Sequence, residues 1–247
     1  MPPFRVERRG TGGDPESRPD LRPQGSDGFR RLRVADGDNY YGERCELGWN
    51  DWPASPVALY HEGEHLYTFL SYRLPDRFPL NRSSWQVVMQ MKQTEPTDGG
   101  GFPTPVLALQ AFDHRWRLYH TGLGNRHGAD RADQEVWSAP ARTDTWVRFA
   151  FDVTYSQDPH VGSVQVYVDK NGDGDALDPG EHSHLMHLQT LAREQPGTDA
   201  DGLAAGVSIP SHLRVGIYHD PKYRCVRNRC SIAIENVGVY TPRPPAN

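Results

Sequence analysis

Residues 83–93 read SSWQVVMQMKQ, a stretch in which apolar and polar residues alternate. Successive side chains of a β-strand point to opposite faces of the sheet, so this alternation predicts a strand with one face turned toward a core. The apolar face is expected to carry Trp85, Val87, Met89 and Met91, and the polar face Gln86, Gln90 and Lys92.

Similar runs recur from Phe29 onward, separated by clusters of Gly, Pro and Asp. They are rich in β-branched and aromatic residues, which favour strands. The other runs are FRRLRV, ERCELGW, HLYTFLSYRL, PVLALQAF, RWRLYH, TWVRFAFDVTY, GSVQVYVD, HLRVGIYH and CSIAIENVGVY. They predict an all-β protein with about ten antiparallel strands in two packed sheets. The best helical candidate is the short segment 183–195.

Length and composition limit the alternatives. A chain of 247 residues with 36% hydrophobic residues can form one large all-β domain. No run approaches the eighteen apolar residues of a membrane span, so no membrane partner is expected. The formal net charge of −5 gives no overall attraction to a polyanion, so no nucleic-acid partner is expected and any electropositive site must be local.

The two ends of the chain differ from its centre. Residues 1–26 contain almost no apolar side chains and are expected to form a disordered lead-in. Residues 27–242 are expected to form the domain, followed by a tail over 243–247. The first residues, MPPFRVERRGTGG, have no apolar segment of the kind a signal peptide carries.

Three cysteines are present. Cys225 and Cys230 enclose the basic sequence VRNR and could close that loop with a disulfide in an oxidising compartment, or remain free thiols. Cys45 alternates with apolar residues and is expected to be a buried small side chain rather than a nucleophile.

Two further strands carry polar faces that suggest chemistry. In the strand around Cys45, Arg44 and Glu46 lie opposite the apolar side chains, and in the strand before Asp220, Arg214 and Tyr218 do so. If these strands neighbour the one over 83–93, their polar faces would meet in one place. The converging side chains would be Arg44, Gln90, Lys92, Arg214 and Tyr218.

Such a set suits β-elimination across a uronic acid. Removal of the C5 proton builds negative charge on the adjacent carboxylate, which Gln90 or an arginine can stabilise in the manner of an oxyanion hole. A tyrosine beside cations can ionise below its usual pKa of about 10 and exchange protons with the substrate; whether Tyr218 removes a proton or donates one is left open. The alternative is an ordinary solvated sheet surface.

Four segments resemble those of the jelly-roll polysaccharide lyases that include heparin lyase I and glucuronan lyases, and more distantly the alginate lyases. GERCEL (42–47) is similar to the family's G-E-R-A/S-E-L strand, and SSWQVVMQMKQ (83–93) to its W-x-x-x-x-Q-x-H/K strand. LRVGIYHDP (213–221) is similar to the K/R-x-G-x-Y strand and SIAIENVGVY (231–240) to the closing strand. The resemblance extends over most of 27–242 and implies a concanavalin-like β-jelly-roll sandwich with a substrate groove across its concave sheet.

The resemblance also implies roles. Tyr218 would be the catalytic tyrosine, Gln90 the residue that neutralises the carboxylate, and Arg44 and Arg214 substrate-binding cations. Several relatives have a histidine base at the position of Lys92, and a lysine with its ordinary pKa of about 10.4 is a poor base at neutral pH. Either Tyr218 makes both proton transfers, or a histidine from elsewhere, such as His61, His65 or His219, is the general base.

A basic loop follows Tyr218. Lys222, Arg224, Arg227 and Arg229 fall within eight residues, beside Tyr223. Such a cluster is either a solvated loop or a grip for carboxylates or sulfates. The expected substrate-binding residues are Arg214, His219, Lys222, Tyr223 and Glu46.

Two motifs suggest metals. Residues 61–65, HEGEH, match the zinc-protease pattern H-E-x-x-H, which works only on a helix, whereas Gly63 and the strand-like flanks favour a turn. Residues 169–181, DKNGDGDALDPGE, resemble a calcium loop after a strand, with Glu181 one position late for an EF-hand. The expected ligands of a structural Ca²⁺ are Asp169, Asn171, Asp173, Asp175 and Glu181, against a plain acidic hairpin loop; no organic cofactor is expected.

The leading hypothesis is a secreted, monomeric lyase that cleaves an acidic polysaccharide, such as glucuronan or a heparin-like polymer, by β-elimination. A glycosidase is disfavoured, because the strand carboxylates Glu43 and Glu46 fall on opposite faces. The alternatives are a non-catalytic, lectin-like carbohydrate-binding module and, less favoured, a zinc protease through His61 and His65.

Overall fold

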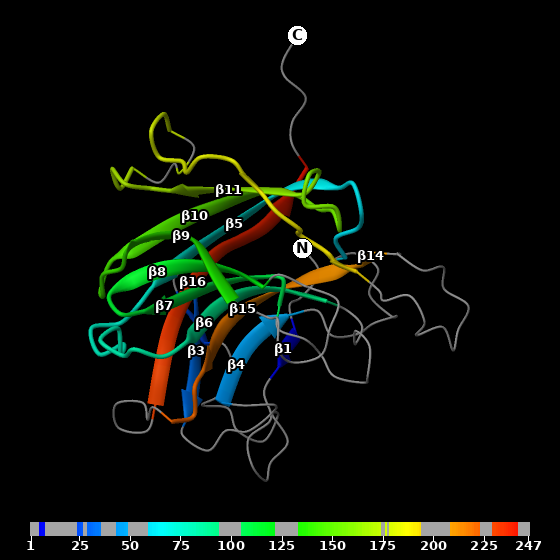
Figure 1. Cartoon of the computed structure of the whole chain (residues 1–247). Helices are drawn as coiled ribbons and strands as arrows, with labels where there is room; N and C mark the ends of the chain where they lie inside the picture. Colours follow the sequence, from blue (N-terminus) through cyan, green and yellow to red (C-terminus); the bar gives the residue numbers. More distant parts are fainter. Residues whose placement is uncertain are drawn as a thin grey trace, which may run out of the picture.

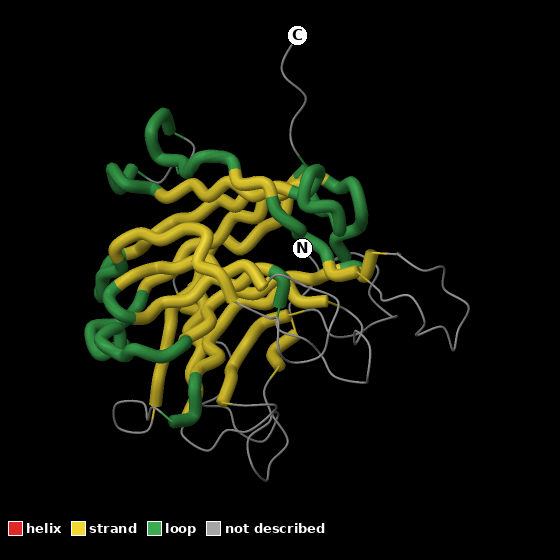
Figure 2. Tube along the Cα trace, in the orientation of Figure 1, coloured by secondary structure: helices red, strands yellow, loops and turns green. Residues whose placement is uncertain are grey.

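A computed structural model shows a β-jelly-roll sandwich made of two seven-stranded antiparallel sheets (Figures 1 and 2). The first sheet has the order β1 (Arg5–Glu7), β4 (Glu43–Gly48), β15 (Ser211–His219), β6 (Gln86–Gln93), β7 (Leu107–Phe112), β8 (Arg115–Thr121) and β9 (Asp133–Pro140). The second has the order β12 (Met186–His187), β11 (Ser163–Val168), β10 (Trp146–Thr154), β5 (His65–Arg73), β16 (Arg229–Tyr240), β3 (Phe29–Ala35) and β2 (Gln24–Ser26). A small third sheet pairs β13 (Ala192–Arg193) with β14 (Ser208–Ile209).

The structure describes residues 5–7, 24–26, 29–35, 43–48, 59–93, 105–121, 133–173, 176, 178–193, 208–222 and 229–241. No helix occurs in these residues, so none of them forms a helix suited to crossing a membrane.

The core lies between the two sheets and is built by alternation along the strands. On β15, Leu213, Val215 and Ile217 are fully buried in it, as the sequence pattern predicted. Side chains of β10 and β16, such as Phe149 and Ile232, meet them from the second sheet. The polar residues between the apolar ones therefore lie on the outer face of the first sheet.

A β-bulge changes the predicted faces of β6. The register between β6 and β7 shifts between Val87 and Met89, because one extra residue is inserted there. Val88, Met89 and Met91 all belong to the core, whereas Trp85 contacts the ring of Tyr218 on the outer face. The prediction that Trp85 and Val87 share a face with Met89 was therefore wrong.

Two local expectations also change. The segment 183–195, considered as a helix, contains β12 and β13 in its described part. Within the expected lead-in over 1–26, Arg5–Glu7 pair with β4 and Gln24–Ser26 with β3, so these residues gain sheet hydrogen bonds that composition does not signal. The rest of that segment lies outside the described residues.

The cysteines follow their expected roles where they are described. Cys45 is a free and fully buried thiol in the core. Cys230 is disulfide-bonded, and Cys225, its expected partner, lies outside the described residues.

Candidate active site

Three adjacent strands of the first sheet bring the predicted polar residues together. Tyr218 of β15 pairs with Arg44 of β4 on one side and with Val87 of β6 on the other. Four residues back along β15, Arg214 pairs with Gln90 of β6. The strands run side by side in the order β4, β15, β6 (Figure 1), so the neighbour relationship that the sequence analysis assumed is confirmed.

The ring of Tyr218 lies between a cation and an aromatic side chain. The Arg44 guanidinium carbon is 3.9 Å from the ring centroid, a cation–π contact. The Trp85 ring packs edge-on against Tyr218 with centroids 4.7 Å apart. Tyr218 is only half-buried, so a ligand can reach it. Sequence reasoning missed Trp85, because the bulge in β6 turns it toward this face.

Glu46 forms a buried link between β4 and β6. It is fully buried; its Oε1 accepts a hydrogen bond from Nε2 of Gln90, and its Oε2 lies 3.5 Å from the Arg44 guanidinium. Gln90 itself is 2% exposed. A single carboxylate thus fixes the positions of both Gln90 and Arg44.

Gly216 allows this link to form. On β15 it pairs with Glu46, directly between β4 and β6. A Cβ at this position would stand 2.2 Å from the backbone oxygen of Cys45, far inside van der Waals contact. The missing side chain therefore lets β4 and β15 approach and leaves the space above β15 to the Glu46 carboxylate.

A buried histidine, His212, neighbours two cations farther along the same face. Nε of Arg214 donates to Nε2 of His212 over 2.9 Å, and His212 pairs with Lys92 on β6. His212 is 3% exposed; burial, together with the charges of Arg214 and Lys92, lowers its pKa to about 3. His212 is therefore neutral at any ordinary pH. Sequence reasoning missed it, although its even spacing from Arg214 places it on this face.

Of the predicted residues after Tyr218, His219 points away from the cluster. His219 is 2% exposed, and its Nε2 lies 3.2 Å from Glu43, which shares the core-facing side of β4 with Cys45. The backbone nitrogen of Lys222 donates to Asp220, which also accepts a hydrogen bond from Ser84. Tyr223, Arg224 and Arg227, and the side chain of Arg229, lie outside the described residues.

The HEGEH segment is a turn, so the zinc-protease interpretation fails. The Glu64 carboxylate accepts a hydrogen bond from the backbone nitrogen of His61, and β5 begins at His65. His65 lies 2.5 Å from Asp152 of β10, while Glu62 binds Ser156. Within the described ranges no three metal-ligating side chains converge.

The acidic loop after β11 closes on itself. Glu181 accepts hydrogen bonds from the backbone nitrogens of Lys170 and Asn171, and Asp169 pairs with Arg148 at 3.1 Å. Asn171 donates to Asp173. These carboxylates form no cage in the part of the loop that is described, and Asp175 lies outside it. Calcium binding here stays a prediction.

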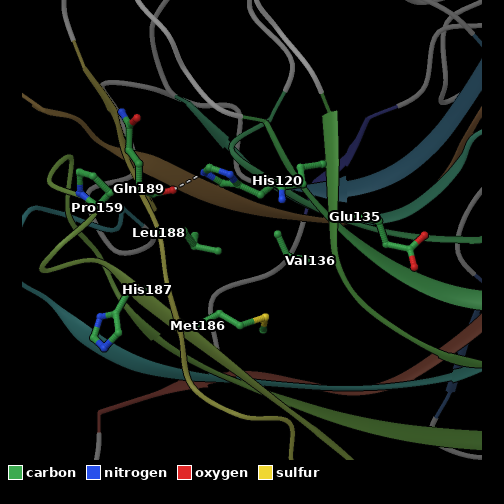
Figure 3. A pocket seen from close by; sticks show the side chains of 9 residues that line it. His120, Glu135, Val136, Pro159, Met186, His187, Leu188 and Gln189 are labelled. Carbon is green, nitrogen blue, oxygen red and sulfur yellow. Dashed lines mark hydrogen bonds between the residues drawn. The ribbon is translucent and has the colours of Figure 1, made fainter.

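A cavity of about 460 Å³ lies between the β8–β9 hairpin and the segment around β12 (Figure 3). The His120 ring nitrogen Nε2 is 2.8 Å from the backbone oxygen of Gln189 at its wall, and burial lowers the pKa of His120. None of the predicted site residues lines it.

Comparison with known proteins gives one family. A family model described as "Polysaccharide lyase" matches residues 9–235. No curated protein sequence matches the chain.

Solved structures share the fold at low sequence identity. An endo-β-1,4-glucuronan lyase from the fungus Trichoderma reesei is 14% identical with a TM-score of 0.62, covering 97% of this chain and 87% of that one. The family 7 alginate lyase A1-II′ in complex with substrate is 13% identical with a TM-score of 0.57, covering 90% and 82%. A GH131 β-glucanase catalytic domain from Podospora anserina is 12% identical with a TM-score of 0.50, covering 99% and 87%. Since the fold occurs in lyases and in a glucanase, activity must be argued from the family and the site.

Proposed function

This chain belongs to the polysaccharide lyase family, and we propose that it cleaves a uronate-containing polysaccharide by β-elimination at the Tyr218 cluster, which comprises Arg44, Glu46, Gln90, Lys92, Arg214 and Tyr218. Its activity as a polysaccharide lyase follows from the family. The acidic substrate and the roles of individual residues are the proposal.

The observation that carries the proposal is the position of the half-buried Tyr218 phenol, with the Arg44 cation 3.9 Å from its ring. Among the described residues on this face of β4, β15 and β6, three cations, Arg44, Lys92 and Arg214, accompany one carboxylate, that of Glu46. The described part of the cluster therefore carries more positive than negative charge in a chain whose net charge is −5, which suits a sugar acid.

The elimination requires one proton to leave and one to arrive. A base takes the C5 proton, the electron pair forms the C4–C5 double bond, and the C4–O4 bond breaks. The leaving oxygen takes up a proton, and a new non-reducing end with an unsaturated uronate remains. Negative charge grows on the uronate carboxylate before the bond breaks, so donors held beside that carboxylate lower the barrier.

Gln90 supplies such a donor. Its Nε2 carries two hydrogens, one of which is bound by Glu46. The second can be donated to the substrate carboxylate while Glu46 keeps the amide in place. Arg44, held by the same carboxylate, adds a positive charge beside the atoms that exchange protons.

We assign both proton transfers to Tyr218. His65 lies on β5 of the second sheet and His61 in the turn before it. His219 is buried against Glu43. His212 lies on the same face, but its Nε2 already accepts a hydrogen bond from Arg214, and a pKa of about 3 makes it a weak base. Tyr218 is the accessible group in the cluster, apart from Lys92, that can accept and then return a proton.

The fold neighbour that acts on glucuronan makes that polymer the first substrate to test. Such polymers lie outside cells, so an exported protein is part of the proposal. The assay follows ultraviolet absorbance of the unsaturated product on glucuronan, heparin, heparan sulfate, hyaluronan and alginate. A rise in absorbance on at least one of them is expected; depolymerisation without any rise would mean hydrolysis and would reject the elimination.

A further inference from the structure

The outer face of the first sheet continues beyond the Tyr218 cluster onto β7 and β8. Val87, the partner of Tyr218, pairs on its other side with Gln110, and Gln110 pairs with Arg117. Neighbouring strands are 4.7–4.9 Å apart, so Gln110 lies about 10 Å from Tyr218 in the same row across the sheet. A polymer bound at Tyr218 and running across the strands would pass over Gln110.

Two aromatic rings lie on this part of the face. Phe112 and Tyr119 are close to parallel, with centroids 6.3 Å apart and 20° between their planes, and the Arg117 guanidinium carbon is 4.9 Å from the Phe112 ring centroid. Both rings are half-buried, so each keeps exposed surface. Flat, partly exposed rings offer apolar surface against which the C–H face of a pyranose can pack.

The charges here are balanced, unlike those at the Tyr218 cluster. Arg117 pairs with Asp113 at 2.7 Å and with Glu135 of β9. The other nearby cation, Arg115, donates to the hydroxyl of Ser138. Two carboxylates thus face two guanidinium groups. Because the described residues of this surface carry no excess positive charge, they offer no particular attraction to a sugar acid.

Two polar atoms on this surface lack partners within the described part of the chain. Gln110 is 7% exposed, and its Oε1 accepts no hydrogen bond; Nε of Arg117 on the next strand donates none. A buried acceptor and donor without partners are costly. A hydroxyl both donates and accepts, and the terminal torsion of a glutamine is soft enough to turn toward one. A sugar hydroxyl at the surface can therefore pair with Gln110 once its amide turns toward it.

We propose that Gln110, Phe112, Arg117 and Tyr119 form a subsite for a neighbouring sugar of the substrate, bound by ring packing and hydroxyl hydrogen bonds with no requirement for a carboxylate. The inference rests on the proposed function, because it places the cleaved sugar at Tyr218. It specifies the substrate class further: the acid is recognised at the cleaved sugar, and the sugar over β7 and β8 can be neutral.

Binding is measured in the Tyr218→Phe background, so that the polymer that the wild type cleaves stays intact. Phe112→Ala and Tyr119→Ala should each raise the dissociation constant by about tenfold. The matched control is Tyr167→Ala on β11 of the second sheet, which removes a half-buried aromatic ring outside the site and should leave binding unchanged. Circular dichroism of each variant checks that the sandwich is intact, and Gln110→Ala tests the site without removing a ring.

The dependence of binding on ionic strength distinguishes this subsite from the charged Tyr218 cluster. The loss caused by Phe112→Ala should be the same at low and high ionic strength, because ring packing is not screened. The loss caused by Arg214→Ala should shrink as salt rises. A Phe112→Ala effect that disappears at high salt would overturn the neutral subsite, as would unchanged binding in the two ring variants and Gln110→Ala.

The direct test uses oligosaccharides of the cleaved polymer in which one uronate is reduced to the neutral sugar. Reducing the sugar over β7 and β8 should leave binding within about threefold, whereas reducing the cleaved sugar should weaken it at least tenfold. Equal losses at both positions would overturn the inference. If instead the wild type cleaves no uronate polymer, the proposed function itself fails, which is a separate result.

Discussion

Nε2 of Gln90 donates a hydrogen bond to Oε1 of Glu46 across β15, above a glycine that has no side chain to block it. This bond joins the two outer strands of a three-stranded unit whose middle strand carries Tyr218. Because the same carboxylate also holds Arg44, the positions of two proposed active-site residues, Gln90 and Arg44, depend on Glu46.

Glu46→Gln should separate turnover from binding. The substitution keeps an oxygen that can accept from Gln90 but removes the charge that holds Arg44, so turnover should fall on the order of tenfold to a hundredfold. The lost negative charge makes the cluster more positive, so the KM for an acidic polymer should not rise. Steady-state kinetics on the cleaved polymer measure both. A rise in KM with unchanged kcat would contradict the positioning role.

Gly216→Ala should destabilise the fold as well as the site. The added methyl group would meet the Cys45 backbone oxygen at 2.2 Å, so β4 and β15 must separate. Overpacking of this kind costs about 1–3 kcal/mol, and here the displaced atom is backbone. Denaturant unfolding measures the loss. Gly63→Ala is the control, because that Cβ would meet no atom within 4 Å and adds only the strain of its positive φ. Equal stability of Gly216→Ala and wild type would refute the argument.

Arg44→Lys should lower turnover although the charge is kept. A lysine ammonium cannot lie flat over the Tyr218 ring as a guanidinium does. We expect a loss of about tenfold in kcat. The matched control is Arg73→Lys. Arg73 lies on β5 of the second sheet, where its exposed side chain pairs with Asp144, and this variant should behave as wild type. If Arg44→Lys also keeps full kcat, the contact has no catalytic role.

His212 should make the folded protein sensitive to acid. Its pKa is about 3 in the fold, against an ordinary value of 6.5, so below pH 6.5 the unfolded chain takes up a proton that the folded chain refuses. The free energy of unfolding should therefore fall as the pH drops from 6.5 toward 3, by at most about 1.4 kcal/mol per pH unit from this group.

Glutamine at position 212 does not titrate and still offers an acceptor to Arg214. His212→Gln should therefore lose less stability than wild type between pH 6.5 and 4. Urea unfolding at several pH values measures the difference between the two curves. Parallel curves would show that His212 is not kept neutral by the fold.

The strands with regular alternation could be predicted from sequence. On β15, the apolar residues Leu213, Val215 and Ile217 lie in the core. Arg214 and Tyr218, at the alternate positions, lie on the outer face. Alternation is a local property, so a sequence displays it directly. That three such strands are neighbours was a hypothesis drawn from their polar faces and supported by the family resemblance, and it agrees with the sheet order.

What could not be predicted depends on contacts between strands. The bulge between Val87 and Met89 is a matter of pairing register, and it moves Trp85 onto the face of Tyr218. The bond from Gln90 to Glu46 requires the strand order and the gap at Gly216 together. His219 was expected to bind substrate or act as the base, but adjacent residues of a strand point to opposite faces, and it contacts Glu43 instead.

Turnover of Tyr218→Phe on the polymer that the wild type cleaves tests directly whether the Tyr218 hydroxyl exchanges protons with the substrate. The substitution removes one oxygen and leaves the ring between Arg44 and Trp85, so binding should be kept. Formation of unsaturated product should slow by about a hundredfold to ten-thousandfold. A Tyr218→Phe enzyme that forms this product at the wild-type rate would contradict this role of the hydroxyl.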